Sequence, residues 1–478
     1  ESMCWEEIGK APIQVKWVDI NKGDEIHREH RSRLVAKEIK RDKREDLFAA
    51  TPPLEAKKIL FSLAVTEGYG FDRGMKSDGM KIDFIDVSRA YFQADAIRRV
   101  FVKLCDEDAE PGMCGLLLKS MYGTRDAAQN WEKEYQSAFT NIGFKQGKSS
   151  PCLFHHPEKD LRIAVHGDDF TTAGDAEQLE WLRVELEKQY ELKVKAALGP
   201  DPHDDTEVRI LNRAVSWTDR GIACEADARH AEIIVRDLGL NKAKSVTTPG
   251  VKQSTNDAAS TSAALGATEA TQYRSLAMRA SYLAQDRADI HFAVKELARD
   301  MSSPSVQKWE RLKRLGRFLL HRPGAVLLFR SQDRVTFADA CVDTDWAGCL
   351  RTRKSTNGGA LMLGGHCIKS WSATQAVVAS SSGEAEFYGV VKGASSLLGL
   401  ISLAADMGIE LKGRIHTDST AARGICNRRG LGKTRHIQTR YLWVQGRLQA
   451  GDFQLFKVPG KENPGDLMTR HLDASTMD

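Results

Sequence analysis

LRIAVHGDDFTTAG, residues 161–174, is the stretch that decides the fold of the first half of the chain. Its apolar start predicts a strand, its centre holds turn-forming residues and its end predicts a returning strand, so Asp168 and Asp169 lie at the tip of a hairpin. Paired aspartates in a turn are more often turn chemistry than a metal site when they stand alone. A strand predicted over residues 81–87 adds a third carboxylate, Asp86. Clustered carboxylates can hold two magnesium ions about 3.5–4 Å apart over a phosphodiester.

A second set of acidic residues lies in the last third of the chain. A strand is predicted up to Asp343, and Asp345 points to the same face because strand side chains alternate, so periodicity does not choose between the two. The sequence SSGE, which ends at Glu384, has the form of a helix-capping box and puts Glu384 and Glu386 in the first turns of one helix. These two glutamates lie about 200° apart around the helix axis, so only one of them can face a metal.

Two further acids complete this second set. Residues 414–419 predict a strand that ends near Asp418, and a glycine-rich loop over residues 458–467 leads into a last predicted helix with Asp466 near its amino end. Each acid taken singly is more often a helix cap or a surface charge than a ligand. As sets, one would suit making nucleic acid and the other would suit cutting it.

The composition excludes several classes of protein. The 478 residues suffice for about three domains, and 41% hydrophobic and 28% charged residues are typical of a globular protein. The net charge of +4 predicts no partner by itself, but between residues 412 and 447 the basic residues face a single acid, Asp418, which favours a polyanionic partner. Nine cysteines without a Cys-x-x-Cys pair argue against a zinc ribbon and a disulfide framework, and they favour a reducing compartment.

Nothing in the sequence predicts a targeting or membrane segment. No apolar run approaches the roughly 18 residues of a membrane span, and no charged-then-apolar signal segment opens the chain. We therefore expect a protein that is neither secreted nor in a membrane. The first residues read as part of an already structured region, which predicts a piece of a longer polypeptide.

The organisation of the chain turns on one polar segment. Small and polar residues without apolar periodicity fill residues 247–271, which predicts a flexible linker. Before it, apolar runs such as residues 161–165 alternate with helical stretches such as residues 176–190, which predicts an α+β domain. After it, residues 273–301 and 305–321 predict two helices, and the final unit beyond them alternates strand and helix.

Seven short motifs occur in a fixed order along the chain. They are RSRLVAKEI from Arg31, DVSRAYF from Asp86, LLLKSMYGTRDAAQNW ending at Trp131, GDDF from Gly167, DWAG from Asp345, EAEF from Glu384 and HTDS from His416. Together they make nearly the whole chain resemble the reverse transcriptase and RNase H region of the Pol polyprotein of copia-type LTR retrotransposons. Their order makes this resemblance far more specific than any one motif.

The resemblance implies a multidomain fold of α+β and α/β parts. Right-hand polymerase fingers and palm would occupy residues 1–246, and the linker residues 247–271. A thumb-like or connection-like helical segment would occupy residues 272–334, and an RNase H-like domain residues 335–478.

The resemblance also implies which acids hold metals. It selects Asp343 over Asp345 and Glu386 over Glu384. Each of two catalytic sets would hold two Mg²⁺ ions, with Mn²⁺ as a substitute. The first set would be Asp86, Asp168 and Asp169, and the second would be Asp343, Glu386, Asp418 and Asp466.

By the same resemblance, other residues would contact the substrates. Tyr91 would be the steric gate against ribonucleotides, and Arg33 and Lys37 would contact the triphosphate, although an ordinary solvated strand is the alternative for these two. A basic segment would bind nucleic acid through Arg428, Arg429, Lys433, Arg435 and His436.

Two departures from the family pattern concern the first set. The family usually has Tyr-Val where this chain has His166 and Gly167, so the side chains beside the primer end are changed. It usually has Gln where this chain has Asp126, and an acid there would repel a triphosphate unless it is paired, for example with Arg125. The metal-binding carboxylates survive both changes, so the resemblance implies impaired or altered polymerisation rather than none.

The resulting hypothesis is an RNA-directed DNA polymerase joined to an RNase H, copying retrotransposon RNA into DNA and degrading the RNA of the hybrid. Its partners would be an RNA template, a DNA primer, the RNA–DNA hybrid and deoxynucleoside triphosphates, within a larger Pol polyprotein. The resemblance places it in cytoplasmic virus-like particles and later in the nucleus. Two alternatives stay open: an RNase H with a decayed polymerase half, and a non-catalytic nucleic-acid-binding remnant.

Overall fold

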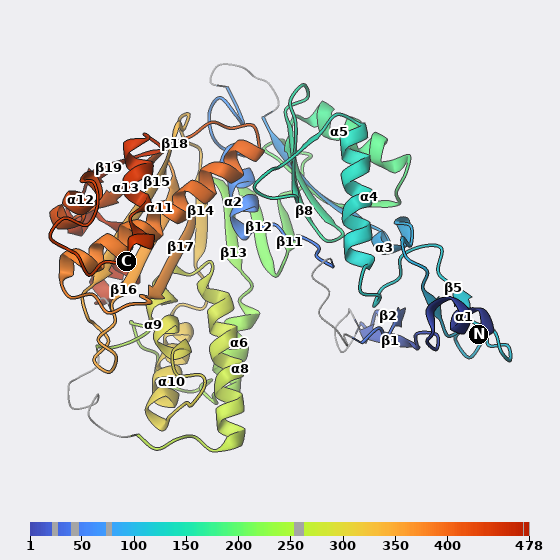
Figure 1. Cartoon of the computed structure of the whole chain (residues 1–478), viewed down its shortest axis with the longest axis horizontal. Helices are drawn as coiled ribbons and strands as arrows, with labels where there is room; N and C mark the ends of the chain where they lie inside the picture. Colours follow the sequence, from blue (N-terminus) through green and yellow to red (C-terminus); the bar gives the residue numbers. More distant parts are fainter. Residues whose placement is uncertain (22–26, 40–46, 73–78, 253–261, 472, 478) are drawn as a thin grey trace. The chain divides into compact units, whose positions relative to one another are not determined.

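The fold comes from a computed structural model that describes all residues except 22–26, 40–46, 73–78, 253–261, 472 and 478. The described chain divides into two compact units, each of which combines helices and β-sheets (Figure 1). Unit 1 contains residues 1–56 and 82–197, and unit 2 contains residues 57–81 and 198–478. The predicted mixture of α and β structure is therefore confirmed, whereas the division into fingers, palm, connection and RNase H-like domain stays a prediction.

A six-stranded sheet forms the centre of unit 1, in the order β10-β3-β9-β8-β7-β6. The predicted hairpin is confirmed, because β8 and β9 are antiparallel and His166 lies opposite Asp169. Trp131, Phe139 and Phe170 are at most 1% exposed and form the core between the sheet and its helices. This core supports the sheet beneath the hairpin tip. The strands are β3 (Lys81–Val87), β6 (Lys145–Gln146), β7 (Leu153–His156), β8 (Leu161–His166), β9 (Asp169–Gly174) and β10 (Leu192–Leu198), and the helices are α4 (Ala127–Asn141) and α5 (Ala176–Glu187).

The other elements of unit 1 are short. Two pairs of antiparallel strands lie outside the central sheet, β1 with β2 and β4 with β5. The N–H of Ala36, at the end of β2, donates to the carbonyl oxygen of Tyr122 at 2.8 Å, which holds β2 beside the segment before α4. The elements are α1 (Ser2–Ile8), β1 (Val15–Asn21), β2 (His30–Ala36), α3 (Ala90–Gln93), β4 (Phe101–Val102) and β5 (Gly115–Leu116).

Unit 2 begins with a four-stranded sheet in the order β11-β12-β13-β14 and a group of helices. Tyr273, Leu312 and Phe318 belong to the buried core of these helices. Helix α8 begins at Ala267, inside the predicted linker, and residues 253–261 of that linker lie outside the described residues. The elements are α2 (Leu54–Ala64), β11 (Glu207–Ile210), β12 (Arg213–Thr218), β13 (Gly221–Ala226), α6 (Arg229–Asp237), α8 (Ala267–Ala284), α9 (Ala288–Ala298), α10 (Val306–His321) and β14 (Val326–Arg330).

The two helices α8 and α9 replace the single helix predicted over residues 273–301, so that prediction was wrong. The break lies at Arg287, whose side chain is 1% exposed. Its guanidinium donates to the Asp289 carboxylate and to two carbonyl oxygens of the segment after α10. A buried charge needs such partners, and partners so far along the chain leave no trace in the local periodicity.

A five-stranded sheet in the order β17-β16-β15-β18-β19 carries the second set of acids. β15, β16 and β17 are antiparallel, whereas β18 runs parallel to both β15 and β19. Its elements are β15 (Phe337–Asp345), β16 (Thr356–Leu363), β17 (His366–Thr374), α11 (Ser382–Asp406), β18 (Lys412–Thr417), α12 (Thr420–Asn427), η1 (Thr439–Tyr441), α13 (Trp443–Gln449), β19 (Phe453–Lys457), η2 (Gly460–Glu462), η3 (Pro464–Met468) and α14 (Ala474–Met477).

Helix α11 is the central helix of this part of unit 2. By length and composition alone it could cross a membrane, whereas no apolar run of that length was predicted from the sequence. It packs on β15, β16 and β18 and buries Phe387, Val390 and Leu397, as a core helix does. The Ser381 side chain accepts a hydrogen bond from the Glu384 N–H, which confirms the predicted N-cap.

Candidate active sites

The first set of carboxylates gathers where β3 ends and the β8–β9 hairpin turns. The N–H of Val87 donates to the carbonyl oxygen of Asp168 at 2.9 Å and joins the strand to the hairpin. The indole N–H of Trp131 donates to the carbonyl oxygen of Gly167 at 2.8 Å, and Gly167 has φ +68, which favours glycine. Burial, and then the charges of the other two acids, raise the pKa of Asp168. The structure thus brings together Asp86, Asp168 and Asp169.

Lys195 of β10 lies between two of these carboxylates, and sequence reasoning missed it. Its ammonium is 2.8 Å from Oδ1 of Asp86 and 2.5 Å from Oδ1 of Asp169. Burial lowers the pKa of Lys195, but the hydrogen bonds with the two aspartates outweigh burial and the pKa is raised. β10 borders β3 in the sheet, so a lysine on β10 reaches the end of β3. A pairing across strands so far apart in sequence gives no local signal.

The predicted nucleotide contacts lie near this set. The rings of Tyr91 and Tyr122 have centroids 4.5 Å apart, and the Arg33 guanidinium lies 4.4 Å from the Tyr122 ring centroid. Burial first, and then the charge of Asp168, raise the pKa of Tyr91. The structure thus groups Tyr91, Tyr122 and Arg33 on the side of Asp168. Lys37 is exposed, and its backbone N–H donates to the carbonyl oxygen of Gln14.

Asp126, the acid that departs from the family pattern, is paired. Its Oδ1 accepts from the Arg98 guanidinium at 2.8 Å, so the partner is Arg98 rather than the Arg125 considered from the sequence. The same guanidinium donates to the Glu38 carboxylate. Burial opposes ionisation of Asp126, but Arg98 outweighs it and the pKa of Asp126 is lowered. Asp126 therefore stays ionised beside a cation that it shares with Glu38, and it repels a nearby triphosphate less than a lone acid would.

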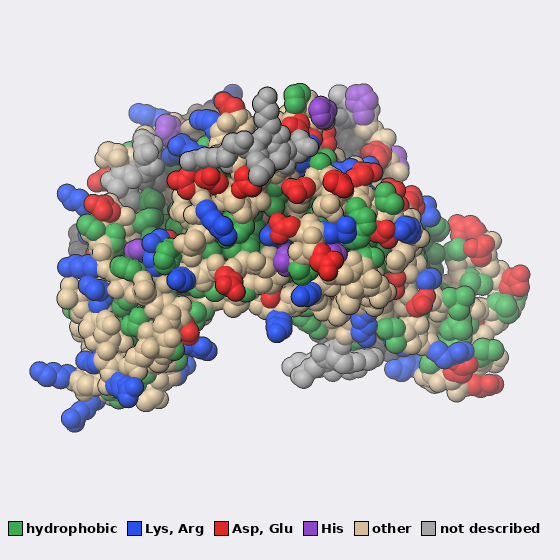
Figure 2. All heavy atoms as spheres, turned by 90° about the horizontal axis from the view of Figure 1, so that it is seen from above, with side chains coloured by type: hydrophobic (Ala, Val, Ile, Leu, Met, Phe, Trp, Pro, Cys, Tyr) green, Lys and Arg blue, Asp and Glu red, His purple; other side chains and the backbone are tan. Residues whose placement is uncertain are grey.

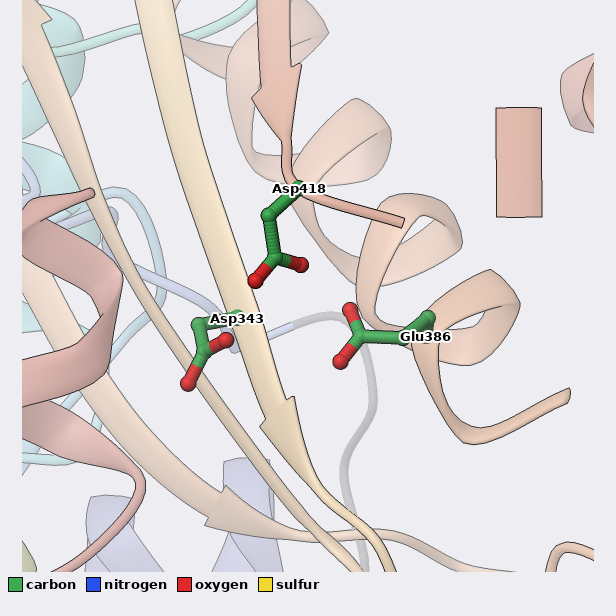
Figure 3. A group of neighbouring side chains, drawn as sticks. All are labelled: Asp343, Glu386 and Asp418. Carbon is green, nitrogen blue, oxygen red and sulfur yellow. The ribbon is translucent and has the colours of Figure 1, made fainter. Parts of the chain in front are cut away.

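The second set of carboxylates lies at the ends of two adjacent parallel strands. The register of β15 and β18 puts Cys341 opposite His416, so Asp343 and Asp418, each two residues further on, meet at the same edge. Glu386 reaches them from the start of α11. One ligand atom from each of these three residues lies within 4.8 Å of the others, in the described part of the chain. Figure 3 shows the three side chains around a common space.

Burial, and not pairing with a cation, governs the ionisation of Asp343 and Glu386 in this second set. Burial, and then neighbouring acids, raise the pKa of Asp343 to about 6 and the pKa of Glu386 to about 8, against smaller opposing effects of Thr469 and Thr344. Among the described residues, no ion pair includes Asp343, Glu386 or Asp418, and the buried Oε2 of Glu386 has no hydrogen-bond partner. An acceptor oxygen buried without a donor fits a cation ligand.

The residues that periodicity could not separate are separated by their contacts. Asp345 accepts a hydrogen bond from the N–H of Thr356 and is not among the three residues whose ligand atoms converge. Glu384 is 3% exposed and accepts hydrogen bonds from Ser380 and from the hydroxyl of Tyr388. Burial opposes ionisation of Glu384, but these donors and His436 outweigh it and its pKa is lowered. Of each pair, the structure directs Asp343 and Glu386 to the common space.

Asp466 lies beside this cluster but outside the group of three. Its carboxylate pairs with Arg470, and its charge contributes to the raised pKa of Asp343. The hydroxyl of Thr469, a contact that the sequence did not predict, donates to Oδ2 of Asp343 at 2.6 Å. The segment η3 packs directly on β16, because a Cβ at Gly358 would lie 2.6 Å from the carbonyl oxygen of Gly465. A glycine at position 358 is what lets η3 approach Asp343.

In the predicted basic segment, some cations are exposed and others make hydrogen bonds within the protein. Arg429, Lys433 and Arg435 are exposed. Arg428 is half-buried and donates to the carbonyl oxygen of Leu431, while His436 pairs with Glu384 at 2.8 Å. The segment is thus anchored to the start of α11 and presents its other cations to solvent. On the face drawn in Figure 2, Lys and Arg side chains are interspersed with Asp and Glu, in keeping with the small net charge.

The chain is similar in sequence to known proteins. The family described as "Reverse transcriptase (RNA-dependent DNA polymerase)" matches residues 6–252. The "Retrovirus-related Pol polyprotein from transposon TNT 1-94" of Nicotiana tabacum is 24% identical over 97% of the chain and 35% of that protein. The corresponding polyprotein from transposon RE2 of Arabidopsis thaliana is 25% identical over 98% of the chain and 32% of that protein. The chain spans about a third of the length of these curated relatives.

Solved structures support the fold. The foamy viral protease-reverse transcriptase in complex with RNA/DNA hybrid matches with a TM-score of 0.50 and 12% identity, over 94% of this chain and 50% of that chain. The foamy viral protease-reverse transcriptase dRH in complex with ds DNA matches with a TM-score of 0.51 and 11% identity, over 92% of this chain and 64% of that chain. At this level of identity the likeness concerns the fold alone.

Proposed function

The chain belongs to the reverse transcriptase (RNA-dependent DNA polymerase) family, and we propose that it is an RNA-directed DNA polymerase whose carboxy-terminal part cuts the RNA strand of an RNA–DNA hybrid. The resemblance to transposon Pol polyproteins that the motifs indicated is confirmed. One observation carries the proposal: each compact unit brings carboxylates from separate elements together, Asp86 and Asp169 around the Lys195 ammonium in unit 1 and Asp343, Glu386 and Asp418 in unit 2.

In the first unit, the residues near Asp168 supply the parts of a nucleotide site. Asp86, Asp168 and Asp169 would hold Mg²⁺, and the position of Lys195 between two of them supports this, because its ammonium already marks a place for a cation. Bound divalent cations would stabilise the charge that develops on the phosphate oxygens. Tyr91 would face the sugar of the incoming nucleotide, and Arg33, fixed over Tyr122, would face its phosphates.

In the second unit, the three converging carboxylates supply the parts of a hydrolytic site. Asp343 and Asp418 would hold Mg²⁺ from the two strand ends, and Glu386 would complete the site through its unpaired oxygen. Thr469 orients Asp343 through its hydroxyl. Asp466, next to the cluster, would take part once Arg470 releases it. RNase H activity and a two-metal reaction are part of this proposal.

The nucleic acid would be held mainly through its phosphates. The exposed cations Arg429, Lys433 and Arg435 would contact the hybrid near the second site, so binding should weaken steeply with salt. Substrates would be deoxynucleoside triphosphates, an RNA template and a DNA primer.

An RNase H with a decayed polymerase half is the second candidate. His166 and Gly167 at the hairpin, which depart from the family pattern, favour it. The pairing of Asp126 with Arg98 removes the other departure as an argument for decay.

Two single substitutions separate these functions. Primer extension on an RNA template with Mg²⁺ or Mn²⁺, and cleavage of the RNA strand of a hybrid, are measured for the purified chain, for Asp168→Asn and for Asp418→Asn. We expect Asp168→Asn to lose DNA synthesis alone and Asp418→Asn to lose RNA cleavage alone. Cleavage without any extension by the unmodified chain would favour the decayed polymerase. If the unmodified chain showed neither cleavage nor extension, the proposal that it is an enzyme would be contradicted.

A further inference from the structure

Lys195 lies where a cation shared by two strands would lie. Its ammonium contacts one oxygen of Asp86 and one oxygen of Asp169, and these carboxylates come from the neighbouring strands β3 and β9. The three side chains are partly exposed, with relative exposures of 33% for Lys195, 27% for Asp86 and 29% for Asp169. The ammonium can therefore leave toward solvent without crossing the core.

A divalent cation and this ammonium cannot both occupy the space between the same two oxygens. A carboxylate lone pair that accepts a hydrogen bond from the ammonium is not available to a metal ion. The ammonium and a divalent cation at such short distances also repel each other strongly. We propose that Lys195 is an internal counter-cation, which a divalent metal ion must displace from Asp86 and Asp169, and which thereby sets the metal affinity of the first set. The inference rests on the proposed function and names Lys195 as a positioning residue for it.

Displacement has a consequence for the form in which metal binds. The released ammonium remains tethered to β10, next to the set, so it repels a bare divalent cation but attracts the phosphates of a metal–nucleoside triphosphate complex. The first set should therefore bind a metal–triphosphate complex in preference to the free ion. Among the described residues, no lysine pairs with Asp343, Glu386 or Asp418, so free metal should bind these three carboxylates without displacing a cation.

The test is direct measurement of Mn²⁺ binding to the full chain by electron paramagnetic resonance, with Asp418→Asn present throughout to weaken the second set. Lys195→Met and Lys195→Gln remove the charge, Lys195→Arg keeps it, and Lys193→Met removes an exposed lysine two residues away on the same strand. We expect Lys195→Met and Lys195→Gln to bind free Mn²⁺ about tenfold more tightly, and Lys195→Arg and Lys193→Met to change the affinity less than about threefold. With Mn²⁺–dATP the gain should vanish or reverse.

An unchanged or weaker affinity for free Mn²⁺ in both neutral variants, each with an unchanged circular dichroism spectrum, would overturn the inference. So would an equal gain in Lys193→Met, because the effect would then come from general charge. The measurement needs no catalysis, so its outcome is separate from that of the proposed polymerase. A chain that extends primers while Lys195→Met binds Mn²⁺ normally retains the function and loses only this inference.

Discussion

The two sets of carboxylates use the same residue types and keep their like charges together in different ways. In the first, a lysine ammonium bridges Asp86 and Asp169 at the partly exposed ends of strands. In the second, none of the described cations pairs with the three acids, Glu386 is 9% exposed, and the cost of burial raises the pKa values of Asp343 and Glu386. In the first set, an ion pair with Lys195 offsets the repulsion between carboxylates. In the second set, burial and neighbouring acids favour the protonated forms of Asp343 and Glu386.

This difference follows from the elements that build each site. The first set lies at a hairpin tip, where a neighbouring edge strand can extend a long side chain over the carboxylates. The second lies between the central strands of a sheet and a core helix, where burial removes the water that would solvate ionised acids. Open carboxylates thus permit a mobile counter-ion, and enclosed ones favour protonation.

The largest effect should separate two glutamates on one helix. Glu386→Gln removes a carboxylate that faces the common space, so we expect RNA cleavage to fall about 1,000-fold, with DNA synthesis unchanged. Glu384→Gln changes a residue that already has donors from Ser380 and Tyr388, and it should lower cleavage less than about tenfold. Single-turnover cleavage of a labelled hybrid checks both. Equal losses would show that the geometry of α11 does not distinguish the two.

The next prediction removes counter-charge in the first unit. Arg98→Ala leaves the partly buried carboxylates of Glu38 and Asp126 without their shared cation, and we expect a loss of roughly 2–4 kcal/mol in the free energy of unfolding. Asp126→Asn in the same chain should recover part of that loss, because one uncompensated charge is removed. Urea unfolding monitored by tryptophan fluorescence measures both variants. An unchanged free energy of unfolding in Arg98→Ala would mean that the ion pairs of Arg98 with Glu38 and Asp126 contribute no stability.

The third prediction uses pH to reveal the bound protons of the second unit. A folded-state pKa of about 8 for Glu386, above its ordinary value, means that the stability contributed by its bound proton is fully present below about pH 4.5 and is lost as the pH rises through 8. In metal-free buffer, Glu386→Gln should therefore match the unmodified chain near pH 4.5 and exceed its stability by roughly 1–3 kcal/mol near pH 8.5.

Thermal unfolding with a chelator at several pH values measures this difference. Asp418→Glu, which keeps a carboxylate at the site, is the matched control. A gain in stability that is the same at every pH would place the effect outside the titration of Glu386.

The smallest effect concerns the exposed cations of the second unit. Lys433→Gln and Arg435→Gln should each weaken binding of an RNA–DNA hybrid about twofold to fivefold and reduce the salt slope by about one, since each removes a phosphate contact. Fluorescence anisotropy at several salt concentrations measures both. An unchanged slope would show that these residues lie away from the bound hybrid.

Local patterns predicted the frame of both sites. The hairpin formers around Asp168 and the capping box ahead of Glu386 act within a few residues, so sequence periodicity recorded them. What escaped prediction depends on partners brought together by the sheets. Lys195 is 26 residues from Asp169, Arg98 is 28 residues from Asp126, and Thr469 is 126 residues from Asp343. Contacts at such separations have no periodic signature.

The choice between Asp343 and Asp345 shows the same limit in one strand. Alternation gives both residues the same face, and only their partners separate them, because Asp345 accepts from the Thr356 N–H of β16 and Asp343 accepts from the Thr469 hydroxyl. The break between α8 and α9 has a similar origin, because the buried Arg287 guanidinium donates hydrogen bonds to carbonyl oxygens after α10. Tertiary partners decided both details.

The contact between Gly358 and η3 has a genetic consequence. A glycine codon has no neighbour, by one change in its first or second base, that encodes an amino acid without a Cβ, and a Cβ at residue 358 would lie 2.6 Å from the carbonyl oxygen of Gly465. Two of the three bases of that codon are therefore intolerant of change. A reading frame that has lost this glycine codon can still encode every carboxylate of the second set, so intact acidic codons alone do not show that η3 can pack against β16.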